Sequence, residues 1–362
     1  MLPVIPSQRA IGTERQSAPR HHVAAFDVIR GWAVLLVLAF HFNVPGAQAA
    51  GRIGVTLFFV LSGYLITHHL AAALAEDGRG LGVVTRHYRR RALRILPPLA
   101  VMLLVVTAIA TAVGTVTIVG PAAVSSAFMV ANLPAPLGVD LLWLSHMWSL
   151  SVEAQFYLVL PVLLVAGFIH RFVAAAVIVG AATVLVLYPA ASGLGIGCLL
   201  AVAGARAVPR LWPPLLTLAG CAVMLVSATM DNQSAYYHLV PAWTASVGAG
   251  LIVGAAAART SSSTANPVKR VGQISYSLYL WHLPIGAVLF PAAYAAGYPW
   301  WVAAVAAVAL SVATAEISYR FVESPFMTAV SRKSSAARWR AVAAASGFAT
   351  RYAAVPVESR SP

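Results

Sequence analysis

Charged residues are scarce in this chain. Asp, Glu, Lys and Arg together make up 9% of its 362 residues, while hydrophobic residues make up 60%. Soluble globular proteins carry about 25% charged residues. With so little charge the chain cannot cover a water-facing surface, so the composition excludes a soluble fold, and its high hydrophobic content excludes disorder. Lipid must be the solvent for most of the chain.

Acidic residues are fewer still, with 10 Asp and Glu against 24 Lys and Arg, a net charge of +14. Such an excess often indicates nucleic-acid binding. Here the basic residues fall in short segments between apolar runs and form no long basic face. Polytopic membrane proteins hold Lys and Arg in their cytoplasmic loops in this way. We therefore expect a lipid bilayer, and not a nucleic acid, as the partner of this chain.

Cysteine is almost absent, since only Cys198 and Cys221 occur, both inside apolar stretches. Two such thiols indicate neither a disulfide framework nor a metal site, and no metal is predicted. The sequence predicts no signal peptide either. The first 23 residues are polar and interrupted by prolines, without an apolar run before a small-residue cleavage site. The first apolar segment is therefore expected to be an uncleaved membrane helix.

Apolar segments of membrane-spanning length recur along the chain, each near the 20 residues that a helix needs to cross hydrocarbon. The sequence predicts an all-α, polytopic membrane helical bundle with about ten transmembrane helices. They are expected at 24–44, 53–75, 95–119, 148–169, 172–189, 190–205, 212–230, 236–258, 274–297 and 299–322.

The placement of Arg and Lys supports ten crossings. If 121–147 does not cross, nearly all the basic residues fall in the two termini and in every second loop, so the positive-inside rule places the N- and C-termini in the cytoplasm. The segment 121–147 is then a partly buried outer segment or a re-entrant hairpin. The predicted organisation is a cytoplasmic tail at 1–23, a membrane domain at 24–326 and a basic, Ala- and Ser-rich cytoplasmic tail at 327–362.

The first predicted span carries three ionisable residues, Asp27, Arg30 and His41. Such groups are costly in a membrane and indicate a function or a partner. Arg30 and His41 are eleven residues apart, about three turns plus 20°, so they share one helix face at roughly 16–17 Å along the axis. They can therefore line one cavity at different depths. The alternative is a structural i,i+3 pair of Asp27 with Arg30 and an interfacial histidine.

Two further groups of polar residues recur beside apolar segments. Arg90, Arg91 and Arg94 lie in RHYRRRALRILPP just before a Pro-Pro pair, where Arg91 and Arg94 share a helical face. Guanidinium groups bind phosphate in bidentate fashion, so the cluster can hold the phosphates of a nucleotide-bearing donor, unless it serves only as a topology signal. Glu153, in HMWSLSVEAQFYLVLP, is expensive in a membrane unless it is paired or protonated.

The last two predicted spans also carry polar residues. ISYSLYLWHLPIG places Tyr276, Tyr279 and His282 in a span. In EISYRFVESPF, the i,i+4 and i,i+3 spacings predict that Arg320 pairs with both Glu316 and Glu323, in a structural triplet.

Six of these segments, in this order, resemble the membrane-bound acyltransferase 3 family, which O-acylates sugars and related acceptors. The resemblance covers about 24–326. The matching pieces are FDVIRGWAVLLVLAFHF, GVTLFFVLSGYLI, RRRALRILPP, MWSLSVEAQFYLVLP, SYSLYLWHLP and YRFVESPF. It implies a multi-pass enzyme of the cell membrane that moves an acyl group, acetyl or another short chain, from acyl-CoA to a hydroxyl of a surface glycan or a macrolide-like glycosylated metabolite.

The resemblance also implies roles for particular residues. Arg30 and His41 match the family's R-x10-H motif, and Glu153 matches the acid of its W-S-L-S-x-E segment, so these three are the predicted catalytic residues. Arg91 and Arg94 match its R-x-x-R motif and, with Arg90 nearby, are expected to bind the CoA phosphates. The chain departs from the family at Thr56, where many members have an acid, and at Ala154, where a second Glu is common.

The mechanism expected from these residues uses neutral His41 as the general base for the acceptor hydroxyl. Glu153 or Asp27 would orient its ring, and Arg30 would stabilise the oxyanion or reach the donor. Two alternatives remain open. A membrane transporter of a glycan or metabolite would also have ten spans and buried charges, and Thr56 is compatible with a catalytically inactive scaffold of the same fold.

Overall fold

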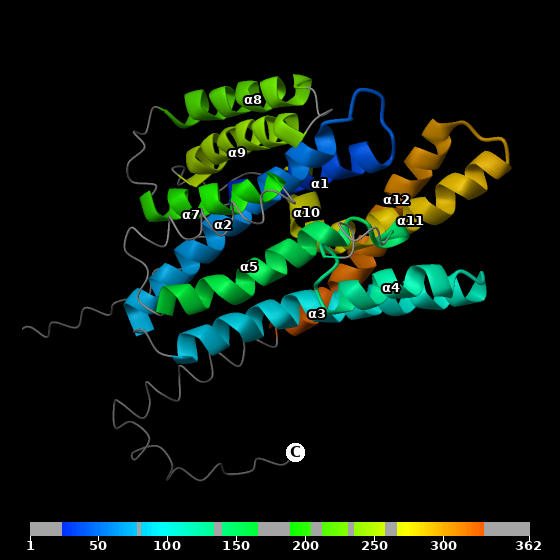
Figure 1. The fold of residues 1–362 in the computed structure, drawn as a ribbon, viewed down its shortest axis with the longest axis horizontal. Coiled ribbons are helices and arrows are strands. Elements are labelled where there is room, and N and C mark those ends of the chain that lie inside the picture. Colours follow the sequence, from blue (N-terminus) through cyan, green and yellow to red (C-terminus); the bar gives the residue numbers. More distant parts are fainter. Residues whose placement is uncertain are drawn as a thin grey trace, which may run out of the picture.

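The structure, a computed structural model, describes residues 24–77, 81–133, 140–165, 189–203, 212–230, 235–257 and 266–328. Within these ranges the chain forms helices and turns without a strand, so the predicted all-α fold is confirmed (Figure 1). The elements are α1 Ala24–His41, α2 Ala50–Asp77, α3 Leu81–Ala112, α4 Val116–Ala127, η2 Leu142–Leu144, α5 Met147–Val165, η3 Pro189–Ala191, α7 Ser192–Ala203, α8 Pro213–Thr229, α9 Ala235–Ala257, α10 Pro267–Gln273, α11 Ser275–Ala295, α12 Trp300–Ser318 and η5 Tyr319–Glu323.

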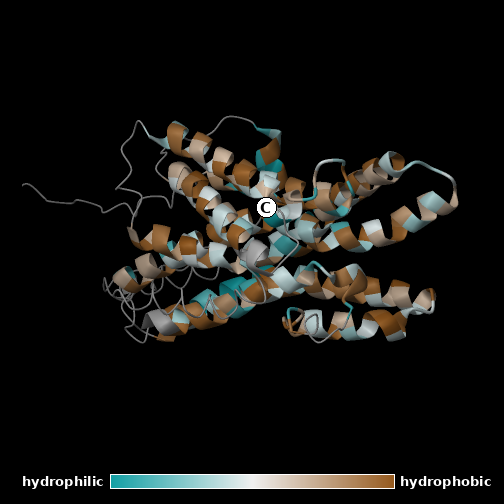
Figure 2. Cartoon of the chain, turned by 45° about the horizontal axis from the view of Figure 1, so that its top comes forward, coloured by the Kyte–Doolittle hydropathy of each residue, from teal (hydrophilic) through white to brown (hydrophobic). Residues whose placement is uncertain are grey.

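Six helices in the described part of the chain are long and apolar enough to cross a membrane. Hydrophobic residues recur along the helices, as expected for a chain whose solvent is lipid (Figure 2). A multi-pass membrane bundle is therefore supported, while the count of ten and the cytoplasmic placement of both termini remain predictions. The six segments are Ala24–His41, Ala50–Glu76, Leu81–Ala112, Val240–Ala257, Ser275–Ala295 and Trp300–Thr328.

The other predicted spans are only partly accounted for. The helices α7 and α8 lie where 190–205 and 212–230 were predicted but have 12 and 17 residues, and α5 has 19. The predicted span 172–189 and most of both predicted tails lie outside the described residues. Within the segment 121–147 the structure describes the end of the 12-residue helix α4 and the short turn η2, and the partly buried outer segment or re-entrant hairpin remains a prediction.

The arginine-rich segment is a helix and not a loop. The predicted span began at residue 95, next to the Pro-Pro pair, but α3 begins at Leu81 and contains Pro97 and Pro98 in its interior. The basic residues 86–94 therefore occupy the first half of a 32-residue helix. A helix holds residues three apart on one face, so Arg91 and Arg94 are presented together as their spacing predicts.

Helix α2 is central and packs against α1, α7, α9, α5 and α3. Its approach to α7 depends on small residues. A Cβ at Gly63 would lie 2.2 Å from the Leu194 carbonyl oxygen, and a Cβ at Gly197 would lie 2.1 Å from that of Val60. Glycine lets membrane helices approach this closely without a hydrophobic driving force. Figure 1 shows α7, α9 and α8 on one side of α2, and α5 and α3 on the other.

The short helix α10 crosses α1 at the ionisable end of that helix. It begins at Pro267, and Asn266 caps it by accepting a hydrogen bond from the Val268 amide at 2.9 Å. Where it crosses, a Cβ at Gly272 would lie only 1.7 Å from the backbone oxygen of Asp27. The crossing therefore fixes the backbone of the turn that carries Asp27 and Arg30.

One pairing predicted from the sequence is wrong. Arg320 pairs with Glu316 at 2.6 Å, but Glu323 instead lies 3.7 Å from Arg94 of α3 and accepts a hydrogen bond from the Ser277 hydroxyl at 3.0 Å. The cause is the π-helical turn η5, which adds a residue to the turn and breaks the i,i+3 register between Arg320 and Glu323. The side chain of Arg320 is 66% exposed and that of Glu323 is 1% exposed. Glu316 is paired as predicted, with a second contact from Arg270.

The glycine at the α10 crossing gives a stability prediction. We expect Gly272→Ala to lower the midpoint of thermal unfolding of the detergent-solubilised protein, because the new methyl group would collide with the backbone of α1. Gly195→Ala in α7 is the matched control, since nothing lies within 4 Å of the position that its methyl group would take. It should leave the midpoint unchanged or raise it slightly, because alanine favours a helix over glycine by up to about 1 kcal/mol. Equal midpoints for the two variants would contradict the close crossing.

The two acids of the last helix should differ in the same way. Glu323→Gln removes a buried charge from Arg94 and Ser277, so we expect a loss of about 1.5–3 kcal/mol in the free energy of unfolding. Glu316→Gln affects partly exposed pairs, which contribute about 0–1 kcal/mol. Denaturant unfolding in detergent followed by tryptophan fluorescence measures both. A larger loss for Glu316→Gln would contradict the assignment of Glu323 as the buried partner of Arg94.

Candidate functional site

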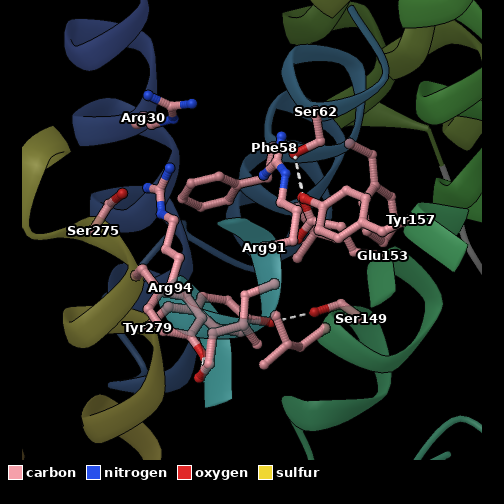
Figure 3. Close-up of a pocket in the computed structure, with 15 residues that line it drawn as sticks. Arg30, Phe58, Ser62, Arg91, Arg94, Ser149, Glu153, Tyr157, Ser275 and Tyr279 are labelled. Atoms are coloured by element: carbon pink, nitrogen blue, oxygen red, sulfur yellow. Dashed lines mark hydrogen bonds between the residues drawn. The ribbon is translucent and has the colours of Figure 1, made fainter. Parts of the chain in front are cut away.

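Five helices line one partly open cavity in the described part of the chain. It receives three guanidinium groups and one carboxyl group, from Arg30, Arg91, Arg94 and Glu153 (Figure 3). The remaining lining residues are Val55, Phe58, Phe59, Ser62, Ile95, Ser149, Leu150, Tyr157, Ser275, Tyr276 and Tyr279. The cavity thus collects four of the six predicted site residues and carries more positive than negative charge.

Arg30 enters the cavity from α1, next to its i,i+3 partner. Its Nη1 atom lies 3.4 Å from Asp27 Oδ1, so the structural pair considered in the sequence analysis is present. The Asp27 side chain is 3% exposed and that of Arg30 is 20% exposed. Pairing with an acid and lining the cavity are therefore compatible, and Arg30 has both properties.

Arg91 and Arg94 enter from α3, each with a partner that holds it. The guanidinium carbon of Arg91 lies 4.5 Å from the ring centroid of Tyr157, a cation–π contact. Arg94 is held by Glu323, at the pair created by the π-helical turn. Arg90, also predicted to bind the donor, is not among the lining residues. The structure thus brings two of the three predicted phosphate-binding arginines to the cavity.

Glu153 lies in a hydrogen-bonded cluster within the cavity wall. The hydroxyls of Ser62 and Tyr157 both donate to its Oε1 atom (Figure 3). These donors satisfy a carboxyl group that hydrocarbon would not solvate. Since Tyr157 also lies under Arg91, the cluster connects Glu153 to the arginines of α3.

The polar residues around Glu153 serve two different surfaces of α5. Ser149 faces the cavity, where its hydroxyl lies 2.6 Å from the Tyr279 hydroxyl. Ser151 and Gln155 instead fix the segment after α4. The Ala131 amide donates to Ser151 at 3.1 Å, and the Gln155 side chain donates to Asn132 at 2.8 Å. Only part of this motif therefore belongs to the site.

His41 is not among the residues that line the cavity. It is half-buried at the end of α1, and its Nδ1 atom lies 3.1 Å from His282 Nε2 and 3.0 Å from the Val37 carbonyl oxygen. His282 in turn lies 2.7 Å from the carbonyl oxygen of Tyr279, which lines the cavity. A chain of direct contacts therefore connects the cavity wall to His41.

The side chain that contacts the His41 ring is neither Glu153 nor Asp27, the two groups predicted to orient it. Asp27 pairs with Arg30, and Glu153 accepts from Ser62 and Tyr157, while the side chain that contacts His41 Nδ1 is His282. Thr56 has no carboxyl group that could orient the His41 ring. Its hydroxyl donates to the Arg52 carbonyl within α2 at 2.8 Å. The sequence showed His282 as a buried polar residue, but only the packing of α11 on α1 shows its partner.

The two cysteines form no disulfide. Cys198 is buried beside Thr67 in the contact between α2 and α7, and Cys221 is exposed on α8. This agrees with the thiols expected from the sequence. Among the described residues, no group of three or more His, Cys, Asp or Glu side chains is arranged to hold a metal ion.

Comparison with known proteins finds related O-acetyltransferases. The chain is 28% identical over 358 residues to the peptidoglycan O-acetyltransferase OatA of Listeria monocytogenes, covering 84% of this chain and 56% of that protein. It is 28% identical to the putative peptidoglycan O-acetyltransferase YrhL of Bacillus subtilis, covering 85% and 56%. It is 27% identical to the O-acetyltransferase OatA of Staphylococcus aureus, covering 86% and 58%. The chain thus spans a little over half the length of these relatives.

No solved structure matches the chain. The sequence model of the acyltransferase 3 family, which describes an acyltransferase domain, matches residues 23–320. This match includes the helices that build the cavity and the segment that carries His41, and it confirms the resemblance inferred from the six sequence segments. The chain belongs to the acyltransferase 3 family.

Proposed function

We propose that this chain is a membrane-embedded O-acyltransferase that moves an acyl group, acetyl or another short chain, from acyl-CoA to a hydroxyl of a carbohydrate. The observation that carries the proposal is the convergence of Arg30, Arg91 and Arg94 on one cavity, in a member of an acyltransferase family. The named relatives, O-acetyltransferases of peptidoglycan, favour acetyl as the group and a glycan as the acceptor. A glycosylated metabolite such as a macrolide offers the same hydroxyl chemistry.

The arginines of the cavity suit a phosphate-bearing donor. CoA carries several phosphate oxygens, and guanidinium groups bind such oxygens through paired N–H donors. Arg91 and Arg94 reach the cavity from the polar half of α3, and Arg30 reaches it from α1. Glu153 accepts a hydrogen bond from Tyr157, and the Tyr157 ring contacts Arg91. We therefore assign Glu153 the role of holding Tyr157 and Arg91 in place at the donor site. Arg90 does not line the cavity, and we assign it to the same donor only because of its place in the sequence motif.

His41 is the proposed general base. As the acceptor oxygen attacks the thioester carbonyl carbon, its proton passes to His41, and a C–O bond forms. The C–S bond then breaks, and the CoA thiolate takes the proton back from the imidazolium, so that free CoA and the O-acyl ester leave. A positioned base typically contributes about 10²–10⁴-fold in rate. Because His41 lies beyond Tyr279 and His282, the thioester has to extend past Tyr279 to reach it.

The Arg30–His41 spacing supports Arg30 on the donor side of this reaction. The roughly 16–17 Å between them along α1 is too long for one oxyanion to contact both. We therefore assign Arg30 to the donor and leave proton transfer to His41. The predicted orientation puts the arginines toward the cytoplasm, where acyl-CoA is made, and His41 toward the outer face of the cell membrane. A glycan outside the cell would then be acylated by a cytoplasmic donor.

A transporter of a glycan or metabolite is the competing class, and the family match argues against it. Incubating the purified protein in detergent with labelled acetyl-CoA separates the two. Slow release of CoA without acceptor, or label transfer to added glycan fragments, supports the acyltransferase. No CoA release, together with glycan flux in vesicles, would support the transporter.

Removing the imidazole should abolish transfer without unfolding the protein. We expect His41→Ala to insert and purify like the wild type and to lose about 10²–10⁴-fold in transfer rate. The matched control is His69→Ala, which removes an exposed histidine of α2 that does not line the cavity. Label transfer at saturating donor and acceptor measures both variants. Normal turnover by His41→Ala would remove the base assignment.

Removing a cavity arginine should weaken donor binding selectively. We expect Arg91→Ala to raise the KM for acyl-CoA by about tenfold or more, since a charge-assisted hydrogen bond contributes about 1.5–3 kcal/mol, and to leave the acceptor KM nearly unchanged. Arg89→Ala is the control, because Arg89 is exposed on the same helix and does not line the cavity. Steady-state kinetics with each substrate varied in turn tests this. A rise confined to the acceptor KM would place the arginines at the acceptor site.

A further inference from the structure

We infer that His282 is a positioning residue that holds His41 in the Nδ1–H tautomer, leaving His41 Nε2 unprotonated as the atom that takes the acceptor proton. This inference rests on the proposed acyl transfer for its chemistry, but its geometric part can be tested without activity. It depends on which atoms of the two rings face each other and which face backbone carbonyls.

The hydrogen-bonding partners fix the protons on both rings. His282 Nδ1 lies 2.7 Å from the Tyr279 carbonyl oxygen, which can only accept, so Nδ1 must carry a proton. In a neutral ring the Nε2 atom of His282 is then an acceptor. It lies 3.1 Å from His41 Nδ1, which must therefore be the donor. His41 Nδ1 also lies 3.0 Å from the Val37 carbonyl oxygen, a second acceptor for the same N–H.

The opposite arrangement is unfavourable at both backbone carbonyls. If His282 donated from Nε2, a neutral His282 would turn an unprotonated Nδ1 toward the Tyr279 carbonyl. His41 Nδ1 would then also be unprotonated, facing the Val37 carbonyl. At each of these two contacts a nitrogen lone pair would then face a carbonyl lone pair at about 3 Å. Each lost hydrogen bond would cost about 1–3 kcal/mol.

A doubly protonated His282 is disfavoured by its surroundings. Its side chain is fully buried, at 0% exposure. The described residues place two other imidazoles against it, with ring centroids at 4.9 Å for His41 and 5.1 Å for His146, and no carboxylate. A buried cation without an anionic partner is expensive, so His282 is neutral.

Packing also fixes the orientation of the His282 ring. The rings of Phe42, His146 and Tyr279 surround it, with centroids 6.3, 5.1 and 5.4 Å away. Tyr279 is itself held, since its hydroxyl lies 2.6 Å from Ser149 and donates to the His146 carbonyl at 3.0 Å. His282 therefore presents its acceptor atom to His41 from a rigid wall.

This arrangement gives His282 the part that a carboxylate has in many acid–base sites. When His41 Nε2 takes the acceptor proton, the imidazolium keeps its Nδ1–H directed at the His282 lone pair and the Val37 carbonyl. The positive charge is thereby stabilised without a permanent negative charge in the membrane. His41 thereby has an orienting partner in a chain whose Thr56 offers no carboxyl group.

The tautomer is measurable by nitrogen NMR. We would label the protein with ¹⁵N-histidine in lipid nanodiscs and assign His41 from the signals lost in His41→Gln. The wild type is expected to show His41 protonated at Nδ1 and unprotonated at Nε2. His282→Gln, whose amide oxygen can accept the same bond, should keep this form, and His282→Phe should lower its share. His69→Phe is the matched control and should change nothing.

Kinetics of the same variants separate positioning from a general loss of structure. We expect His282→Phe to lower kcat by about 10–10²-fold, with the KM for acyl-CoA unchanged within about twofold, because only the base is affected. His282→Gln should recover most of that loss. A donor KM that rises together with the loss of kcat, or a His282→Gln variant no better than His282→Phe, would overturn the positioning role.

The two measurements distinguish failure of this inference from failure of the proposed function. Wild-type His41 protonated at Nε2 would overturn the inference even if transfer is fast. The expected tautomers without any transfer from acyl-CoA would support the His282–His41 geometry and overturn the proposed function. If His282→Phe does not fold, the wild-type and His282→Gln spectra still decide the tautomer.

Discussion

Hydrocarbon cannot solvate charge, and this constraint determines where the polar residues of the chain lie. On apolar helices the ionisable side chains have to turn toward one another or toward a cavity. Arg30, Arg91, Arg94 and Glu153 do so from three helices, and their partners Asp27, Tyr157 and Glu323 hold them in place. The cavity is thus the place where a membrane bundle with little charge concentrates the charge it has.

The site has two parts with different chemistry. One part is the cavity, where fixed guanidinium groups suit an anionic donor. The other is the imidazole pair of His41 and His282, where every described contact is neutral. Tyr279 connects them, because it lines the cavity with its side chain and accepts from His282 with its backbone. In the proposed function, this arrangement separates a charged region that binds the donor from a neutral region that transfers the proton.

Much of this arrangement could be predicted from the sequence. Composition alone indicated lipid as the solvent, and apolar segment lengths placed most of the long described helices close to their observed bounds. Helical periodicity put Arg91 and Arg94 on one face, and the cost of buried charge marked Arg30, His41 and Glu153. The predicted helix positions and the shared face of Arg91 and Arg94 are confirmed, because they depend on local geometry and on solvation, which a single sequence carries.

The rest depends on contacts between segments far apart in the chain. The partner of His41 lies 241 positions away on α11, and the partner of Arg94 lies on the last helix. Neither spacing nor composition carries that information. The start of α3 was misplaced because a Pro-Pro pair usually begins a helix, but here the preceding turns already form one. The pairing of Glu323 was misjudged because an ideal α-helical register was assumed through Tyr319–Glu323.

That π-helical turn has a consequence for how the family can vary. A π-helical turn holds one more residue than an α-helical turn, so it behaves like a single-residue insertion. Removing one residue there would rotate everything after it by about 100° around the helix axis. The carboxylate that neutralises Arg94 would then turn away from it, and the cavity would keep a cation without this partner. A chain of this kind should tolerate many substitutions between Tyr319 and Glu323, but not a change in the number of residues between them.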